Sequence, residues 1–156
     1  MALAITTETP LQDDVRMLVA ELNAYMIPLT PREFQFQLTV EQMAEPGVTL
    51  FVARDEVGRA VGMGALKEHD ADLGEVKRMY TLPEIRGQRA GAELIARIED
   101  MARERGLKSL KLETGEAPGF EPAWRLYERG GFSQCGAFLD YPDSGYSRFY
   151  EKKLTQ

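Results

Sequence analysis

The sequence has very little of the chemistry that sulfur and imidazole provide. Its 156 residues include one cysteine, Cys135, and one histidine, His69. A single cysteine excludes a disulfide within the chain and a zinc site built from cysteines, and we predict no metal site. With so few of these residues, the sequence does not favour Ser-His-Asp or Cys-His catalysis. We expect Cys135 to pack near a strand and His69 to lie in a polar surface turn.

A long apolar run is also missing. A helix that spans a bilayer needs roughly 20 apolar residues in succession, and no stretch of the sequence approaches that length. Residues 1–8 lack the basic region of a signal peptide and are typical of a first strand. We therefore predict a cytoplasmic protein that has no membrane partner.

The sequence lacks an excess of positive charge as well. It has 19 Lys and Arg against 25 Asp and Glu, a net charge of -6. Nucleic-acid binding needs clustered cations against the phosphates, so we expect no nucleic-acid partner. An acidic cleft would favour a cationic partner such as a protonated amine. Hydrophobic residues make up 44% of the chain, enough for the core of one domain, which we place at residues 1–156.

The N-terminal half predicts two helices followed by three strands. Apolar residues recur every three or four positions over 11–26, which is typical of a helix with one buried face. Pro31 suits the first turn of a second, shorter helix over about 31–43. The apolar, β-branched segments that follow lie at 48–53, 60–66 and 74–81. Because only short turns separate them, we expect an antiparallel meander.

The C-terminal half follows another pattern. A loop over 83–91 leads into a long amphipathic helix that ends before Gly106, and a strand follows at 108–114. Strand, helix and strand in this order form a crossover, so strands 74–81 and 108–114 should be parallel. A helix at 122–129 and strands around 132–139 and 147–153 complete the chain. The predicted class is α/β (α+β): a mixed, mostly antiparallel central sheet with a central parallel βαβ unit and helices on both faces.

Residues 86–91, RGQRAG, stand between a predicted strand and a predicted helix. Glycines let the backbone turn tightly and come close to a ligand. The first turn of a helix offers unpaired N–H groups and partial positive charge, which together suit a pyrophosphate. Neither the Walker A pattern nor G-x-G-x-x-G is present. Taken alone, the loop fits an ordinary helix cap equally well.

Two blocks of the sequence resemble motifs of the GNAT acetyltransferases. Residues 74–94 resemble motif A, with Arg86 and Gly91 at the first and last positions of Gln/Arg-x-x-Gly-x-Gly/Ala and Arg89 at the usual middle glycine. The five marked positions of motif B, A-x-x-L-Y-x-x-x-G-F, are matched by Ala123, Leu126, Tyr127, Gly131 and Phe132. The family's frequent Asn before motif B is missing from residues 115–122. The resemblance covers roughly residues 48–154 and implies a GNAT fold, acetyl-CoA as co-substrate and N-acetyltransferase activity.

The resemblance also implies how acetyl-CoA binds. The strand before the phosphate loop would part from its parallel neighbour at a bulge, and the pantetheine arm would lie in the gap. The backbones of Met79 and Thr81 would pair with that arm, and the Met79 N–H would stabilise the oxyanion formed during attack. The cofactor-binding residues that it implies are Met79, Tyr80, Thr81, Arg86, Gly87, Gln88, Arg89, Ala90, Gly91, Ala92 and Tyr127.

Two candidates for acid and base chemistry follow from the same resemblance. Tyr127 stands where many members place a general acid for the departing thiolate; the other interpretation is a ring that packs on the cofactor. Glu75 stands where some members carry a catalytic base. Alternation along the strand places Glu75 and Lys77 on one face, so a surface ion pair is the alternative. Glu113, near the end of the next strand, is a substitute base. Transfer would be direct, in a ternary complex, without an acyl-enzyme.

The acceptor site would lie between the N-terminal helices and the loop 138–147. Tyr25, Phe34 and Tyr141 are its predicted residues; further candidates are Met26, Phe36 and Tyr146, and residues of each of these types are more often part of a core than of a contact surface. Aromatic walls suit a small amine or an amino-acid-like substrate through cation–π contact. A protein or peptide acceptor and a non-catalytic acyl-CoA sensor are the alternatives. Relatives are often homodimers, so a homodimer is the implied assembly.

Overall fold

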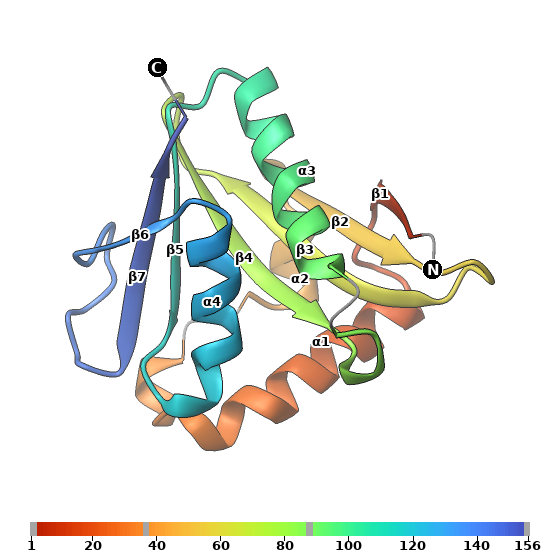
Figure 1. The fold of residues 1–156 in the computed structure, drawn as a ribbon, viewed down its shortest axis with the longest axis horizontal. Coiled ribbons are helices and arrows are strands. Elements are labelled where there is room, and N and C mark those ends of the chain that lie inside the picture. Colours follow the sequence, from red (N-terminus) through yellow and green to blue (C-terminus); the bar gives the residue numbers. More distant parts are fainter. Residues whose placement is uncertain (1–2, 36–37, 87–88, 155–156) are drawn as a thin grey trace.

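A computed structural model describes residues 3–35, 38–86 and 89–154 of the chain (Figure 1). The described residues form one seven-stranded sheet in the order β1-β2-β3-β4-β5-β7-β6. Only β4 and β5 pair in parallel; the other neighbours are antiparallel, so the predicted mixed, mostly antiparallel sheet is confirmed. The strands are β1 (Ala4–Glu8), β2 (Val48–Arg54), β3 (Ala60–Glu68), β4 (Leu73–Thr81), β5 (Ser109–Gly115), β6 (Ser133–Cys135) and β7 (Ser147–Lys153).

Helices cover both faces of the sheet, as predicted. In Figure 1, α3 and α4 lie on the face turned to the viewer, and α1 and α2 lie on the other. The α-helices are α1 (Asp13–Met26), α2 (Val40–Met43), α3 (Ala90–Glu104) and α4 (Glu121–Arg129). The 3-10 turns are η1 (Ile27–Leu29), η2 (Arg32–Phe34), η3 (Pro83–Ile85) and η4 (Pro118–Phe120). The long helices bury apolar stripes, for example Leu18 and Leu22 of α1 and Leu94 and Ile98 of α3.

Two predicted elements are shorter than expected. The predicted helix over 31–43 is wrong: a 3-10 turn follows Pro31, the backbone becomes extended at Gln35, with φ -101° and ψ 119°, and α2 begins only after Thr39. There the Thr39 side chain accepts a hydrogen bond from the Gln42 N–H, a capping box that sets the start of the helix. The predicted strand over 132–139 also ends early, at Cys135. Leu139 has φ 51°, a left-handed conformation that a strand does not accommodate.

The parallel pair β4 and β5 separates soon after it begins. Pairing runs from Leu73 opposite Ser109 to Glu75 opposite Lys111, and Figure 1 shows the strands diverging beyond that point. On its other side, β4 bulges against β3: the register shifts between Met63 and Ala65, and Arg78 has φ 56°. A Cβ atom at Gly64 would overlap Met79 Sδ, so a larger residue opposite the bulge would require the Met79 side chain to move. The bulge and the lost pairing together open the sheet.

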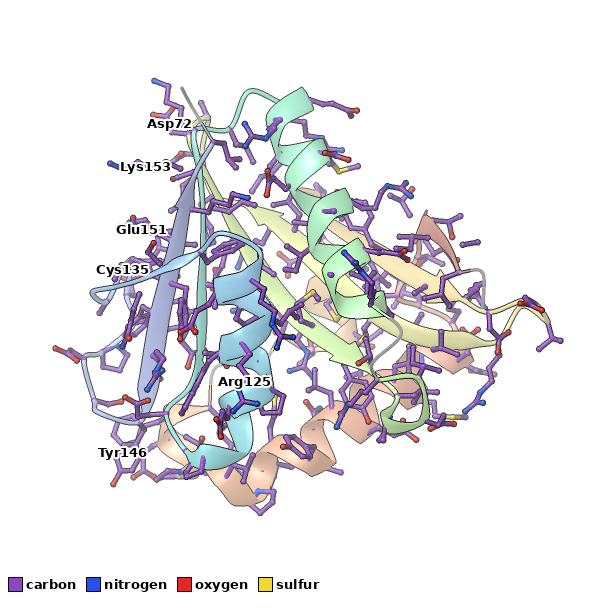
Figure 2. The ribbon with its side chains drawn as sticks, viewed as in Figure 1. Asp72, Arg125, Cys135, Tyr146, Glu151 and Lys153 are labelled. Atoms are coloured by element: carbon purple, nitrogen blue, oxygen red, sulfur yellow. The ribbon has the colours of Figure 1, made fainter. Side chains whose placement is uncertain are left out.

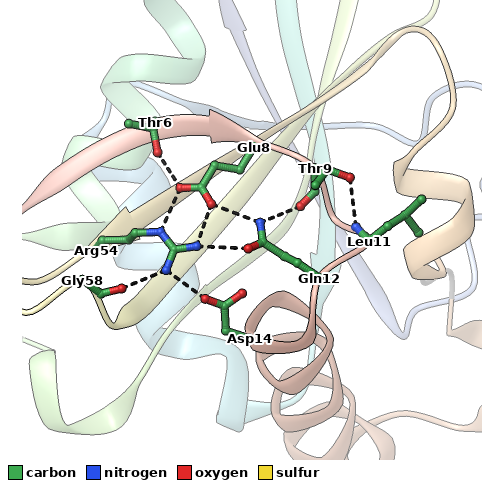
Figure 3. A network of polar contacts seen from close by, with 8 residues as sticks. All are labelled: Thr6, Glu8, Thr9, Leu11, Gln12, Asp14, Arg54 and Gly58. Carbon is green, nitrogen blue, oxygen red and sulfur yellow. Dashed lines mark hydrogen bonds and ion pairs between the residues drawn. The ribbon is translucent and has the colours of Figure 1, made fainter.

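The N-terminal strand and helix are anchored to the sheet by the Arg54 guanidinium (Figure 3). Its Nε and Nη2 donate to the Glu8 carboxylate over 2.9 and 2.6 Å. Its Nη1 donates to Asp14 Oδ2 over 2.8 Å and to the Gly58 carbonyl oxygen over 2.9 Å. One side chain therefore links β1, the first turn of α1 and the β2–β3 turn. This pairing lowers the pKa of Glu8 from 4.5 to about 2.

We predict that Arg54→Ala lowers the free energy of unfolding by about 2 kcal/mol at pH 7, because several charge-assisted hydrogen bonds are lost together. The folded-state pKa of Glu8 lies below its unfolded value, so its contribution is complete above pH 4.5 and is lost as the pH falls toward about 2. Urea unfolding at pH 7 and pH 3 checks both statements. Arg125→Ala, in an exposed pair with Glu121, is the control and should change stability by less than about 0.5 kcal/mol. An equal loss in both variants, or a pH-independent difference, would contradict this role.

Candidate active site

A cavity of about 720 Å³ occupies the opening between β4 and β5. Its walls are the bulged end of β4, the end of β5, the first turn of α3, the inner face of α4 and the segment from α1 to η2. The cavity therefore reaches the helices on both faces of the sheet. This is the position expected for a ligand in an α/β sheet, at the carboxyl ends of parallel strands and beside a helix N-terminus.

The first turn of α3 forms one end of the cavity. Arg89 is the N-cap residue, with φ 66°, so an arginine takes the left-handed conformation for which this loop more often uses glycine. Ala90, Gly91 and Ala92 follow it and line the cavity. A Cβ atom at Gly91 would lie 3.2 Å from Leu126 Cδ2, because α3 packs closely on α4 here. The unpaired amides of this first turn are available to an anion.

The cavity is cationic although the chain is acidic. Its described lining includes five cations, Lys77, Arg78, Arg86, Arg89 and Arg129, against one carboxylate, Glu113. The cleft is therefore not acidic, and the preference of an acidic cleft for a cationic partner does not apply to this site. Net charge did not reveal this because the acidic residues lie on other surfaces. An anion is the ligand that such a lining attracts.

Tyr127 of α4 reaches the cavity from within the core. Its side chain is 6% exposed, and its ring packs against Phe132 and Tyr150 with centroids 6.0 and 6.1 Å away. Burial, and secondarily the charge of Glu113, raise the pKa of the Tyr127 hydroxyl well above 10. The phenol therefore stays protonated at neutral pH and can donate a proton or a hydrogen bond into the cavity.

The carboxylate of Glu113 also faces the cavity. Its Oε2 accepts a hydrogen bond from Ser147 Oγ over 2.7 Å. Burial raises the pKa of Glu113 above 4.5, and this outweighs the lowering by Ser147 and Lys77. A carboxylate with a raised pKa is a stronger base than an exposed one. Sequence reasoning named Glu113 only as a substitute for Glu75.

Glu75 lies behind the cavity wall, 2% exposed, at the centre of a polar cluster. Its oxygens contact His69 Nε2 at 2.8 Å, the Tyr141 hydroxyl at 2.5 Å and Lys77 Nζ at 3.3 Å. Lys77 itself lines the cavity. The Glu75–Lys77 pair is therefore buried, not a surface ion pair. His69 is half-buried against this cluster, which the expectation of a surface turn did not include.

The predicted acceptor residues divide into two groups. Tyr25 and Phe34 line the cavity together with Met26, whereas the lining contains neither Tyr141 nor Tyr146. The Tyr25 hydroxyl donates to the Gly119 carbonyl oxygen over 2.5 Å, and Phe34 stacks on Tyr146 at 5.0 Å. Tyr141 belongs to the Glu75 cluster instead. The predicted residue Phe36 lies outside the described residues.

The predicted cofactor residues surround the same cavity. The lining includes Met79, Tyr80, Thr81, Arg86, Arg89, Ala90, Gly91, Ala92 and Tyr127. Arg86 lies over the rings of Tyr25 and Tyr80, 6.0 and 5.9 Å from their centroids. Gly87 and Gln88 lie outside the described residues. Sequence reasoning missed Arg78 and Arg129; the i, i+3 spacing of Arg129 from Leu126 could have placed it on the cavity face of α4.

Neither the cysteine nor a metal-ligand cluster contributes to this site among the described residues. Cys135 lies on β6, the outermost strand, at the edge of the sheet (Figure 2), and is not part of the cavity lining. Within residues 3–35, 38–86 and 89–154, no group of three His, Cys, Asp or Glu side chains is placed to hold a metal ion. Across the same ranges, no helix is both long and apolar enough to span a membrane.

Known proteins resemble this chain in sequence and in fold. A model of the acetyltransferase (GNAT) family matches residues 15–132. The IAA acetyltransferase of Azospirillum brasilense is 41% identical over 151 residues, which cover 96% of this chain and 97% of that protein. A crystal structure described as an acyl-CoA N-acyltransferase from Klebsiella pneumoniae superposes with a TM-score of 0.82 at 34% identity, covering 98% of each chain. An aminoglycoside 6'-N-acetyltransferase complexed with coenzyme A shares the fold, with a TM-score of 0.73 at 15% identity and 98% of each chain covered.

We predict that Glu75→Gln lowers the free energy of unfolding by about 3 kcal/mol, because it leaves the charge of Lys77 buried without its carboxylate. Urea unfolding at pH 7 measures the change. Glu41→Gln removes the carboxylate of the exposed Arg16 pair and is the matched control, with an expected change below about 0.5 kcal/mol. A loss below 1 kcal/mol in Glu75→Gln would show that the cluster is not a buried ion pair.

Proposed function

The chain belongs to the acetyltransferase (GNAT) family and is an acyltransferase; we propose that it transfers acetyl from acetyl-CoA directly to a primary amine of a small or amino-acid-like molecule. One observation carries this proposal. A single cavity joins the anion-binding first turn of α3 to an aromatic compartment under α1, through the opening between β4 and β5. A donor and an acceptor that enter from opposite faces would meet in that opening.

The donor fits the end of the cavity at α3. The amides of Ala90, Gly91 and Ala92, with Arg86 and Arg89 nearby, suit a pyrophosphate. Beyond Glu75, β4 no longer pairs with β5, so the backbone that follows on this side can pair with a pantetheine arm. The Met79 N–H and the Thr81 backbone are the groups that we assign to it. Roles for Gly87 and Gln88 stay predictions.

The acetyl group moves directly from sulfur to nitrogen, by addition of the amine followed by elimination of the thiolate. The neutral amine attacks the thioester carbonyl carbon, the C–N bond forms, and the C–S bond then breaks. The Met79 N–H stabilises the negative charge that develops on the carbonyl oxygen. Tyr127 donates a proton to the leaving thiolate, and the amine proton passes to Glu113 directly or through water. Glu113 is preferred over Glu75 because it lines the cavity, whereas Glu75 is buried behind Lys77.

The walls of the acceptor compartment favour a small molecule over a peptide. Tyr25, Met26 and Phe34 form its wall, and the Tyr25 hydrogen bond to Gly119 ties α1 to η4 across it. A peptide acceptor needs an open groove. Cytoplasmic location and a homodimer stay predictions, because neither is a property of a single chain.

We predict that Tyr127→Phe lowers kcat about 100-fold, because the thiolate loses its proton donor, while the KM for acetyl-CoA changes less than about threefold. A free-thiol assay against a panel of amines, polyamines, amino acids and peptides measures both. Tyr146→Phe, outside the cavity, should leave both constants unchanged. A sensor would bind acetyl-CoA without amine-dependent thiol release, and unchanged turnover in Tyr127→Phe would remove the hydroxyl from the mechanism.

We predict that Glu113→Gln lowers kcat/KM and removes one limb of its pH dependence. The base must be ionised, so in the wild type kcat/KM should rise with pH through the raised pKa of Glu113, above 4.5. The amine supplies a separate limb at higher pH, which should remain in the variant. Profiles of kcat/KM from pH 4.5 to 9 with one amine distinguish the two. Retention of the lower limb in Glu113→Gln would assign it to another group.

A further inference from the structure

Arg78 carries a buried positive charge that no described carboxylate pairs with. Its side chain is 7% exposed and lines the cavity, yet none of the ion pairs among the described residues involves it. Its Nη2 donates to Asn23 Oδ1, whereas its Nε is buried without a hydrogen-bond partner. Burial lowers the pKa of Arg78 to about 10, so the guanidinium is still charged at neutral pH. A buried charge of this kind is costly unless an anion binds it.

The bulge decides which part of the cavity Arg78 faces. Met79 lies against Gly64 beside Ile98 of α3, whereas Arg78 reaches Asn23 of α1 on the other face. Arg78 adopts φ 56°, a conformation that is uncommon for residues other than glycine. Because Asn23 belongs to α1, the Arg78 side chain lies in the acceptor compartment. The arginines at the α3 end, Arg86 and Arg89, are available to the phosphates of the donor, so those phosphates do not account for Arg78.

The one carboxylate in the lining does not satisfy Arg78 either. Glu113 accepts its hydrogen bond from Ser147. The pKa of Arg78 is lowered by burial, whereas a carboxylate close by would raise it. The acceptor compartment thus contains a base, Glu113, and separately a cation with a free Nε–H. A molecule that carries both an amine and an anionic group would fit both.

We propose that the acetyl acceptor carries a carboxylate next to its amine, as an amino acid does, and that Arg78 binds this carboxylate. The proposal rests on the proposed N-acetyltransferase function and specifies its substrate. Guanidinium N–H groups on neighbouring nitrogens can bind both oxygens of one carboxylate. Asn23 orients the guanidinium, which makes Asn23 a positioning residue. The bound carboxylate directs the amine toward Glu113 and the opening where the thioester lies.

Matched acceptors test the proposal. The wild type is assayed for free-thiol release with L-amino acids and with their α-carboxamides, which keep the amine and the side chain but lack the charge. We expect kcat/KM to be about 100-fold higher for the acids, because the carboxamides lose the charge-assisted hydrogen bonds to the guanidinium. Arg78→Gln should lower kcat/KM for the acids about 100-fold and for the carboxamides less than about threefold. Arg125→Gln on the exposed face of α4 is the control and should change neither.

The readouts separate failure of the substrate class from failure of the enzyme. Equal rates with acids and carboxamides in the wild type would overturn the role of Arg78 and leave the N-acetyltransferase function standing. No thiol release with any amine, despite acetyl-CoA binding by calorimetry, would overturn both. Because Arg78→Gln could also reduce folding, the ratio of the two rates is compared within each variant, and Asn23→Ala should lower that ratio in the same direction. Loss of acetyl-CoA affinity in Arg78→Gln, with the ratio unchanged, would assign Arg78 to the donor and overturn the proposal.

Discussion

The site depends on the separation of β4 from β5 after three paired positions. A parallel sheet normally continues its ladder and buries both faces, and here the ladder stops at Glu75 while β5 goes on pairing with β7 as far as Gly115. The bulge at Arg78 bends β4 away and leaves its backbone groups available to a ligand. Without this opening, the helices on the two faces would be separated by a closed sheet, and a donor and an acceptor could not meet.

The charge of the cavity is opposite in sign to the net charge of the chain. The chain has a net charge of -6, yet cations dominate the described lining of the cavity. The exposed acidic residues keep the surface negative, whereas the cavity retains a local positive potential because low-dielectric walls screen it poorly. Beneath the wall, Glu75 compensates Lys77 and is itself bonded to His69 and Tyr141. That cluster holds the loop before β7 against β4, on the face that also carries Glu113.

Most of the secondary structure could be predicted because local patterns decide it. The apolar spacing of α1 and α3, the stop at Gly106 with φ 76°, and the bounds of β7 agree with the structure. The segment around Pro31 could not be predicted in this way. The helical path that begins after Pro31 ends at Gln35, which is extended, and the Thr39 capping box starts α2 later. The strand over 132–139 was predicted too long for a similar reason, since Leu139 adopts a left-handed conformation that its residue type does not predict.

The sequence by itself determined the family, the order of the strands' connections and the location of the glycine-bearing loop before α3, because these follow from motifs and from local periodicity. Only the tertiary structure decided which acid faces the cavity. Alternation places Glu75 and Lys77 on one face of β4, but the approach of Tyr141 from the loop before β7 encloses Glu75 and leaves Glu113 at the cavity wall. The unpaired charge of Arg78 is likewise a tertiary property. A residue's burial and contact partners depend on segments that are far away in the chain. A local sequence pattern therefore cannot predict which segment will cover that residue.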